Sequence, residues 1–183
     1  MPEPYDIRPE VRRDHVAIDA VHNAAFGSDA DIPALVRDLR AADAPFPTLS
    51  VVATHDGTAV GHVMASHAWL DGPRELIDVL VLSPLGVHPA HQRKGLGTAL
   101  IAAVLRAAEG KGAPMVLLEG SPGYYGARGF EPASAQDIRR PSLRIPSPAF
   151  QVATLPAYTP DMTGTFIYRD VHWRHGVGLY KTS

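Results

Sequence analysis

The sequence contains no cysteine among its 183 residues, and this absence removes several classes of function. Without a thiol, the chain has no disulfide framework, no cysteine nucleophile and no thiolate ligand for zinc. It also lacks a long apolar run, since no uninterrupted stretch approaches the roughly 18 residues that span a bilayer. The first residues lack the basic and apolar regions of a signal peptide. We therefore expect a cytoplasmic protein without a membrane partner.

A strong excess of charge of either sign is also missing. The formal net charge is −2, which gives no reason to expect a nucleic-acid partner. Apolar residues make up 45% of the chain and charged residues 20%, the balance of a globular protein with a substantial core. Repeats and low-complexity segments are absent from the sequence. We expect one domain over residues 1–183.

Two kinds of apolar periodicity indicate an α/β fold. Apolar or β-rich runs predict strands over residues 5–8, 48–55, 58–70, 76–82, 85–87, 114–118, 149–155 and 165–170. Helical spacing predicts a first helix that ends at Gly27 and in which Val16, Ala20, Val21 and Ala24 share a face. Further helices are predicted from about 29–33 to 39, over 95–109 and over 122–128. Asp56-Gly57 predicts a tight hairpin. The strand, helix and strand over residues 85–118 predict a parallel pair with a right-handed connection.

The segment from Val87 to Leu100 is the most informative part of the chain. It joins an apolar strand to an Ala/Leu-rich helix through a turn that holds Arg93, Lys94 and two glycines, Gly95 and Gly97. Glycine lets the backbone approach a ligand closely, and a helix start offers unpaired N–H groups to an anion. The alternative is an ordinary connection with solvated basic residues. The spacing of a P-loop is absent, and a dinucleotide fingerprint would need a third glycine where Leu100 stands.

Two motifs resemble those of the GNAT superfamily of N-acetyltransferases. Gln92-Arg93-Lys94-Gly95-Leu96-Gly97 fills the acyl-CoA-binding signature Q/R-x-x-G-x-G/A, and Tyr125 to Phe130 reads as the later motif Y-x-x-x-G-F. The resemblance implies a mixed, mainly antiparallel central sheet with a splayed parallel strand pair and helices on both faces. It implies acetyl-CoA as co-substrate. The residues that it assigns to the coenzyme are Leu85, Gly86, Val87, Gln92, Arg93, Lys94, Gly95, Leu96, Gly97 and Thr98.

Acyl transfer by direct attack needs an acid that protonates the departing thiolate. Tyr125 suits that role because a phenol keeps its proton at neutral pH, and the resemblance assigns it the same role. The alternative is an aromatic core residue. The general base stays unassigned among Glu75, Asp78 and Glu119. The loose spacing of the nine histidines, including His172-x-x-His175, does not favour a metal site, so we expect no metal.

The predicted function is transfer of an acetyl group from acetyl-CoA to a primary amine. The partner is a small-molecule or peptide amine, which residues 22–47 and 132–165 are expected to select. A homodimer is compatible with the sequence. Two alternatives are a non-catalytic acyl-CoA-binding or sensing module, which would not need Tyr125, and a nucleotide-binding domain of another class.

Overall fold

The protein is described here from a computed structural model that covers residues 5–42 and 44–178. Its strands are β1 (Tyr5–Pro9), β2 (Leu49–His55), β3 (Thr58–Asp71), β4 (Leu76–Val87), β5 (Met115–Glu119), β6 (Glu131–Pro132), β7 (Ile138–Arg139), β8 (Phe150–Thr154) and β9 (Gly164–Ile167). Its α-helices are α1 (His15–Phe26), α2 (Ile32–Ala41), α3 (Leu96–Gly110), α4 (Pro122–Gly126) and α5 (Asp170–Arg174). The chain divides into two compact units, and β3, β4 and α3 run through both.

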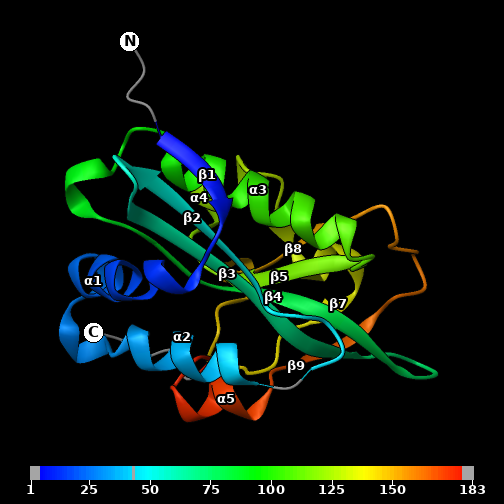
Figure 1. Ribbon diagram of the computed structural model, residues 1–183. Coiled ribbons are helices and arrows are strands. Elements are labelled where there is room, and N and C mark those ends of the chain that lie inside the picture. The colour runs from blue at the N-terminus through cyan, green and yellow to red at the C-terminus, as the bar shows by residue number, and fades with distance from the viewer. Residues whose placement is uncertain (1–4, 43, 179–183) are drawn as a thin grey trace. The chain divides into compact units, whose positions relative to one another are not determined.

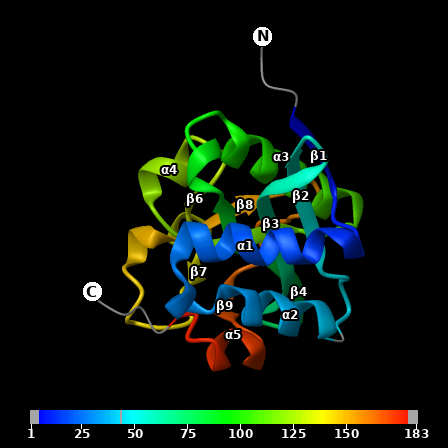
Figure 2. The same ribbon diagram turned by 60° about the vertical axis from the view of Figure 1, so that its left-hand side comes forward.

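Within the described residues, unit 1 comprises 5–42, 48–65 and 82–107. Antiparallel pairing joins β1 to β2 and β2 to β3, and β4 follows β3 in the strand order. Helices cover both faces of these strands: Gly61 of β3 lies under Leu100 of α3, whereas its neighbour His62 points to the other face and contacts His22 of α1. Helices α1 and α2 lie side by side in both views (Figures 1 and 2).

Unit 2 comprises, of the residues that the structure describes, 44–47, 66–81 and 108–178. Here β5 pairs in parallel with β4 and antiparallel with β8, and β8 also pairs with β6. The end of β3 pairs with β9, which pairs in parallel with β7. The core of this unit is built around the rings of Phe150, Phe166 and Tyr168. The ring centroid of Phe166 lies 5.2 Å from that of Phe150 and 4.9 Å from that of Tyr168. Such tilted and edge-on aromatic pairs add to the stabilisation from apolar burial.

The predicted mixed sheet with helices on both faces is confirmed. The Asp56-Gly57 turn is present, with both residues at positive φ (49° and 78°). Parallel pairing of β4 with β5 covers Leu80 and Val81, while β4 itself continues to Val87. The predicted single domain stays a prediction, and residues 1–4, 43 and 179–183 of it lie outside the described residues.

One predicted core face is wrong. The α1 pattern placed Val16 inside, but its side chain is 83% exposed, and Ala20 and Ala24 are also exposed. The buried face instead carries Ile18, Val21 and His22. A polar residue takes a core position because its ring finds a hydrogen-bond partner there, which the apolar pattern alone does not reveal.

Candidate active site

Two hydrogen bonds anchor the glycine turn of unit 1, one to β3 and one to the end of β4. The His88 N–H donates to the Val60 carbonyl at 2.8 Å, and the Gln92 side-chain amide donates to the Val87 carbonyl at 3.0 Å. A short 3₁₀ turn over Pro89–His91 separates these two residues. Gln92, the first residue of the predicted signature, therefore holds the turn in shape.

The turn ends in a backbone conformation that requires glycine. Gly95 has φ +83°, and a Cβ there would meet no atom within 4 Å, so the backbone at this point is uncovered. Arg93 also has positive φ, at 62°, and its side chain is exposed. Helix α3 starts at Leu96, whose side chain is buried. The structure thus combines an open glycine backbone, a cationic side chain and a helix start, which is the chemistry of an anion site.

The last residues of β4 alternate in burial. Gly86 is buried, whereas Leu85 and Val87 on either side are half-buried. A Cβ on Gly86 would lie 2.8 Å from Nδ1 of His22 and 3.2 Å from the ring of Phe26, both on α1. Only glycine fits there without moving a neighbour, so α1 packs directly on the backbone of this strand.

Tyr125 lies in unit 2, in the short helix α4 that follows β5. Its ring packs on Gly120, where a Cβ would collide with it, and edge-on against Phe130. The Phe130 N–H donates to the Tyr125 carbonyl at 3.2 Å, which links the first and last residues of the predicted Y-x-x-x-G-F motif. Burial, with a smaller effect of Tyr124, raises the pKa of Tyr125 to about 12. The phenol therefore keeps its proton at neutral pH.

The three candidate carboxylates have different surroundings. Glu75 is exposed in the turn before β4. Asp78 contacts Nε2 of His67 at 2.7 Å, which gives it the partner expected for an acid in an apolar strand. Glu119 ends β5 and accepts a 2.5 Å hydrogen bond from the hydroxyl of Tyr168. Burial raises the pKa of Glu119, and the bond from Tyr168 partly offsets this effect.

A buried histidine pair in unit 1 was not predicted from the sequence. Nε2 of His22 and Nδ1 of His62 are 2.7 Å apart, and Nε2 of His62 is 2.7 Å from Oγ of Ser50. Glu10 completes the group at 3.5 Å from the same His62 nitrogen, held by two hydrogen bonds from Arg40. The signal that was available is the position of His22 four residues after Ile18, on the face that α1 buries.

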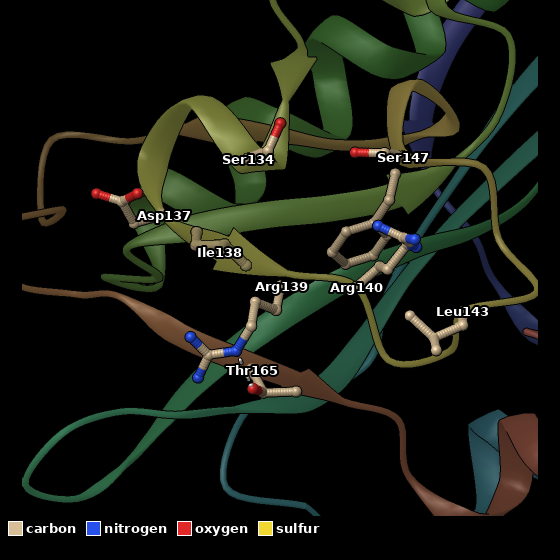
Figure 3. Close-up of a pocket in the computed structure, with 9 residues that line it drawn as sticks. Ser134, Asp137, Ile138, Arg139, Arg140, Leu143, Ser147 and Thr165 are labelled. Atoms are coloured by element: carbon tan, nitrogen blue, oxygen red, sulfur yellow. Dashed lines mark hydrogen bonds between the residues drawn. The ribbon is translucent and has the colours of Figure 1, made fainter.

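Unit 2 also contains a pocket of about 370 Å³ (Figure 3). Its apolar lining comes from Ile138, Leu143 and Phe150, and its cationic groups are Arg139 and Arg140. One carboxylate, that of Asp137, and three hydroxyl residues complete the polar lining, the latter being Ser134, Ser147 and Thr165. The pocket lies within the stretch that the sequence assigns to acceptor selection, and its chemistry suits a ligand with an anionic group and an apolar body.

Two further features concern only residues 5–42 and 44–178. No group of three or more His, Asp or Glu side chains in this part is arranged to hold a metal ion. None of the helices within it has the length and apolar character needed to cross a bilayer.

Comparison with known proteins identifies the family. The model of the acetyltransferase (GNAT) family matches residues 16–130, more than half of the chain. The chain belongs to the GNAT family. This confirms the resemblance seen in the two motifs, and it excludes a nucleotide-binding domain of another class.

Individual GNAT relatives agree with this assignment. The chain is 32% identical over 117 residues to the uncharacterized N-acetyltransferase YjhQ of Escherichia coli K12, a match that covers 64% of each protein. Among solved structures, it resembles the E. coli GNAT N-acetyltransferase YhbS in complex with CoA, with TM-score 0.80 and 32% identity over 93% of this chain and 92% of that one. A Brucella melitensis GNAT acetyltransferase with acetyl-CoA gives TM-score 0.72 and 30% identity over 92% and 98%.

Proposed function

We propose that this GNAT protein transfers the acetyl group of acetyl-CoA to a primary amine by direct attack. The observation that carries the proposal is the turn after β4, where Gly95 leaves the backbone uncovered at the start of α3 beside the exposed Arg93. This arrangement suits the pyrophosphate of a coenzyme. Similar chains of E. coli and B. melitensis were crystallised with CoA and acetyl-CoA, which supports the same ligand here.

Ten residues make up the proposed coenzyme site. We assign the pyrophosphate to Gln92, Arg93, Lys94, Gly95, Leu96, Gly97 and Thr98, of which the buried Leu96 contributes its backbone alone. We assign the pantetheine arm to the backbone of Leu85, Gly86 and Val87. Most of these residues need no side-chain contact with the coenzyme, since backbone N–H groups at a helix start bind anions directly. Arg93 adds a charge that strengthens the contact.

Tyr125 is the proposed general acid. When the amine nitrogen bonds to the thioester carbon, a tetrahedral intermediate forms, and its collapse breaks the C–S bond. The thiolate then takes the phenolic proton. Burial raises the pKa of Tyr125 to about 12, so the phenol still holds its proton when the thiolate leaves.

Ligand-induced thermal shifts test the coenzyme part of the proposal. Acetyl-CoA at 100 times its dissociation constant should stabilise the protein by about 2.7 kcal/mol, whereas NAD and ATP should not. Stabilisation by NAD or ATP in place of acetyl-CoA would refute the coenzyme assignment.

Release of the CoA thiol, with mass spectrometry of the acetylated product, tests the transfer. The amine panel is putrescine, kanamycin, L-phenylalanine, L-phenylalaninamide and a lysine-containing peptide. The two phenylalanine compounds differ in their carboxylate, the group that the pocket with Arg139 and Arg140 would favour. Acetyl-CoA binding without transfer to any amine would instead support a non-catalytic module.

A further inference from the structure

The histidine pair of unit 1 forms one continuous chain of polar contacts. It runs from His22 through His62 and Ser50 to Glu10, with both 2.7 Å steps made by imidazole nitrogens. Both imidazoles are fully buried, with 0% exposure, while the side chain of Glu10 is 13% exposed. This series of contacts therefore connects an interior position beside Gly86 of β4 to a carboxylate that water reaches.

The direction of the hydrogen bonds follows from the chemistry of Glu10. A carboxylate only accepts, so the Ser50 hydroxyl donates to Glu10, and Ser50 Oγ in turn accepts from the Nε2–H of His62 at 2.7 Å. With its proton on Nε2, neutral His62 has a bare Nδ1, which accepts from the Nε2–H of His22. By the same logic, neutral His22 has its lone pair on Nδ1.

That last nitrogen is the open end of the chain. Among the described residues, Nδ1 of His22 is buried and has no hydrogen-bond partner. It lies against Gly86, at 2.8 Å from the place that a Cβ would take. A buried polar atom without a partner is costly, by about 1–3 kcal/mol, so its place beside the proposed coenzyme strand calls for an explanation.

We propose that His22 is the general base of this protein and that His62, Ser50 and Glu10 carry the proton away. The proposal rests on the proposed acetyl transfer. As the amine nitrogen bonds to the acetyl carbon, its proton passes to Nδ1 of His22. The Nε2 proton of His22 moves to Nδ1 of His62, the Nε2 proton of His62 moves to Ser50, and the Ser50 hydroxyl proton moves to Glu10.

When the transfer is complete both rings are neutral again, now with their protons on Nδ1, and each returns to the Nε2–H form before the next turnover. This outcome suits their environment, because burial lowers the pKa of His22 to about 3 and also lowers the pKa of His62. Burial raises the pKa of Glu10, but hydrogen bonds from His62, Arg40 and Ser50 outweigh that effect and hold it well below its usual value. Glu10 therefore releases the proton to water, and neither imidazole stores a charge.

Charged groups on neighbouring elements shape the chain as well. Arg40 of α2 opposes a positive charge on either ring, and Asp19 of α1 favours one on His62. His15, also on α1, has Nε2 3.7 Å from Glu10. Any fall in activity at low pH would therefore reflect all of these charged groups together. For this reason the test compares two nucleophiles and does not rely on a pH profile alone.

The kinetic test uses His22→Gln, which keeps a donor toward His62 but has no basic nitrogen. The nucleophiles are the most active amine of the panel and hydroxylamine, whose nitrogen is a far stronger acid after attack and loses its proton to water without a base. Loss of a general base should lower kcat for the amine by about 10²-fold or more and affect hydroxylamine far less. His172→Gln is the control, because His172 is equally buried with an unpartnered Nδ1 in unit 2. It should leave the ratio of the two rates unchanged.

The tautomer test needs no acceptor. Proton–nitrogen correlation NMR of ¹⁵N-histidine protein should show His22 and His62 neutral at pH 7, each with its proton on Nε2. A proton on Nδ1 of His22 would overturn the assignment. In the kinetic test, an equal loss of kcat with both nucleophiles in His22→Gln would overturn the relay. A selective loss of kcat with the amine in Glu119→Gln but not in His22→Gln would overturn it as well.

Failure of the proposed function has a different signature. A wild-type protein that acetylates neither the amines nor hydroxylamine removes the reaction and the relay with it. A wild-type protein that acetylates both, with an unchanged rate ratio in His22→Gln, removes the relay alone.

Discussion

Acid should destabilise this protein through His22. Burial lowers the pKa of this imidazole from 6.5 to about 3, so the unfolded chain binds a proton at His22 that the folded chain rejects. The contribution is absent above pH 6.5 and grows as the pH falls from there toward 3. At pH 5 it amounts to about 2 kcal/mol, since each pH unit below the unfolded pKa costs about 1.4 kcal/mol. The free energy of unfolding of a native protein is typically about 5–15 kcal/mol, so this contribution is a substantial fraction of it.

Urea unfolding followed by circular dichroism measures this contribution. Wild type and His22→Gln are compared at pH 8, 7 and 5. Between pH 8 and 7 the two free energies of unfolding should change in parallel. Between pH 7 and 5 the wild type should lose about 2 kcal/mol more than the variant. Parallel curves over the whole range would refute the reasoning, because they would mean that His22 is as easily protonated in the folded protein as in the unfolded one.

Three substitutions test the packing of the candidate site. Gly86→Ala should cost about 1–3 kcal/mol of stability in urea unfolding, because its Cβ meets His22, and His22→Ala in the same chain should recover most of the loss. Arg93→Gly should weaken acetyl-CoA binding about tenfold in calorimetry without lowering Tm, because glycine accepts the positive φ of this position. Gly120→Ala should lower kcat but not acetyl-CoA affinity, because it displaces the Tyr125 ring, and an unchanged kcat would contradict that role.

Local sequence signals predicted the parts of the fold that local chemistry determines. The turn after β4 was predicted because glycine spacing and a helix start are both readable in a few residues. The Asp56-Gly57 hairpin was predicted for the same reason. The strand expected over residues 165–170 ends earlier, at Ile167, and α5 begins at Asp170. Apolar periodicity alone did not reveal this stop, because Tyr168 continues the core past the end of the strand.

The histidine relay illustrates what local patterns leave out. His22 and His62 are 40 residues apart and meet only because α1 packs on the sheet of unit 1. The predicted α1 face favoured Val16 on hydropathy, although Val16 is exposed and His22 is buried. Hydropathy assigns a histidine to the surface unless its partner is known, and that partner lies on another element. The same limit left the general base unassigned among carboxylates close in sequence.

Turnover of acetyl-CoA by Tyr125→Phe, beside wild type and the neighbouring control Tyr124→Phe, tests the central claim most directly. The measurement is release of the CoA thiol together with the acetylated amine by mass spectrometry, after calorimetry has shown how tightly each protein binds acetyl-CoA. We predict that wild type and Tyr124→Phe each release CoA thiol and acetylated amine in equal amounts. Tyr125→Phe should bind acetyl-CoA as tightly as wild type but turn it over at least about a hundredfold more slowly. Full turnover by Tyr125→Phe would contradict its role as the acid, and a wild-type protein that neither binds acetyl-CoA nor forms the acetylated amine would contradict the proposed function itself.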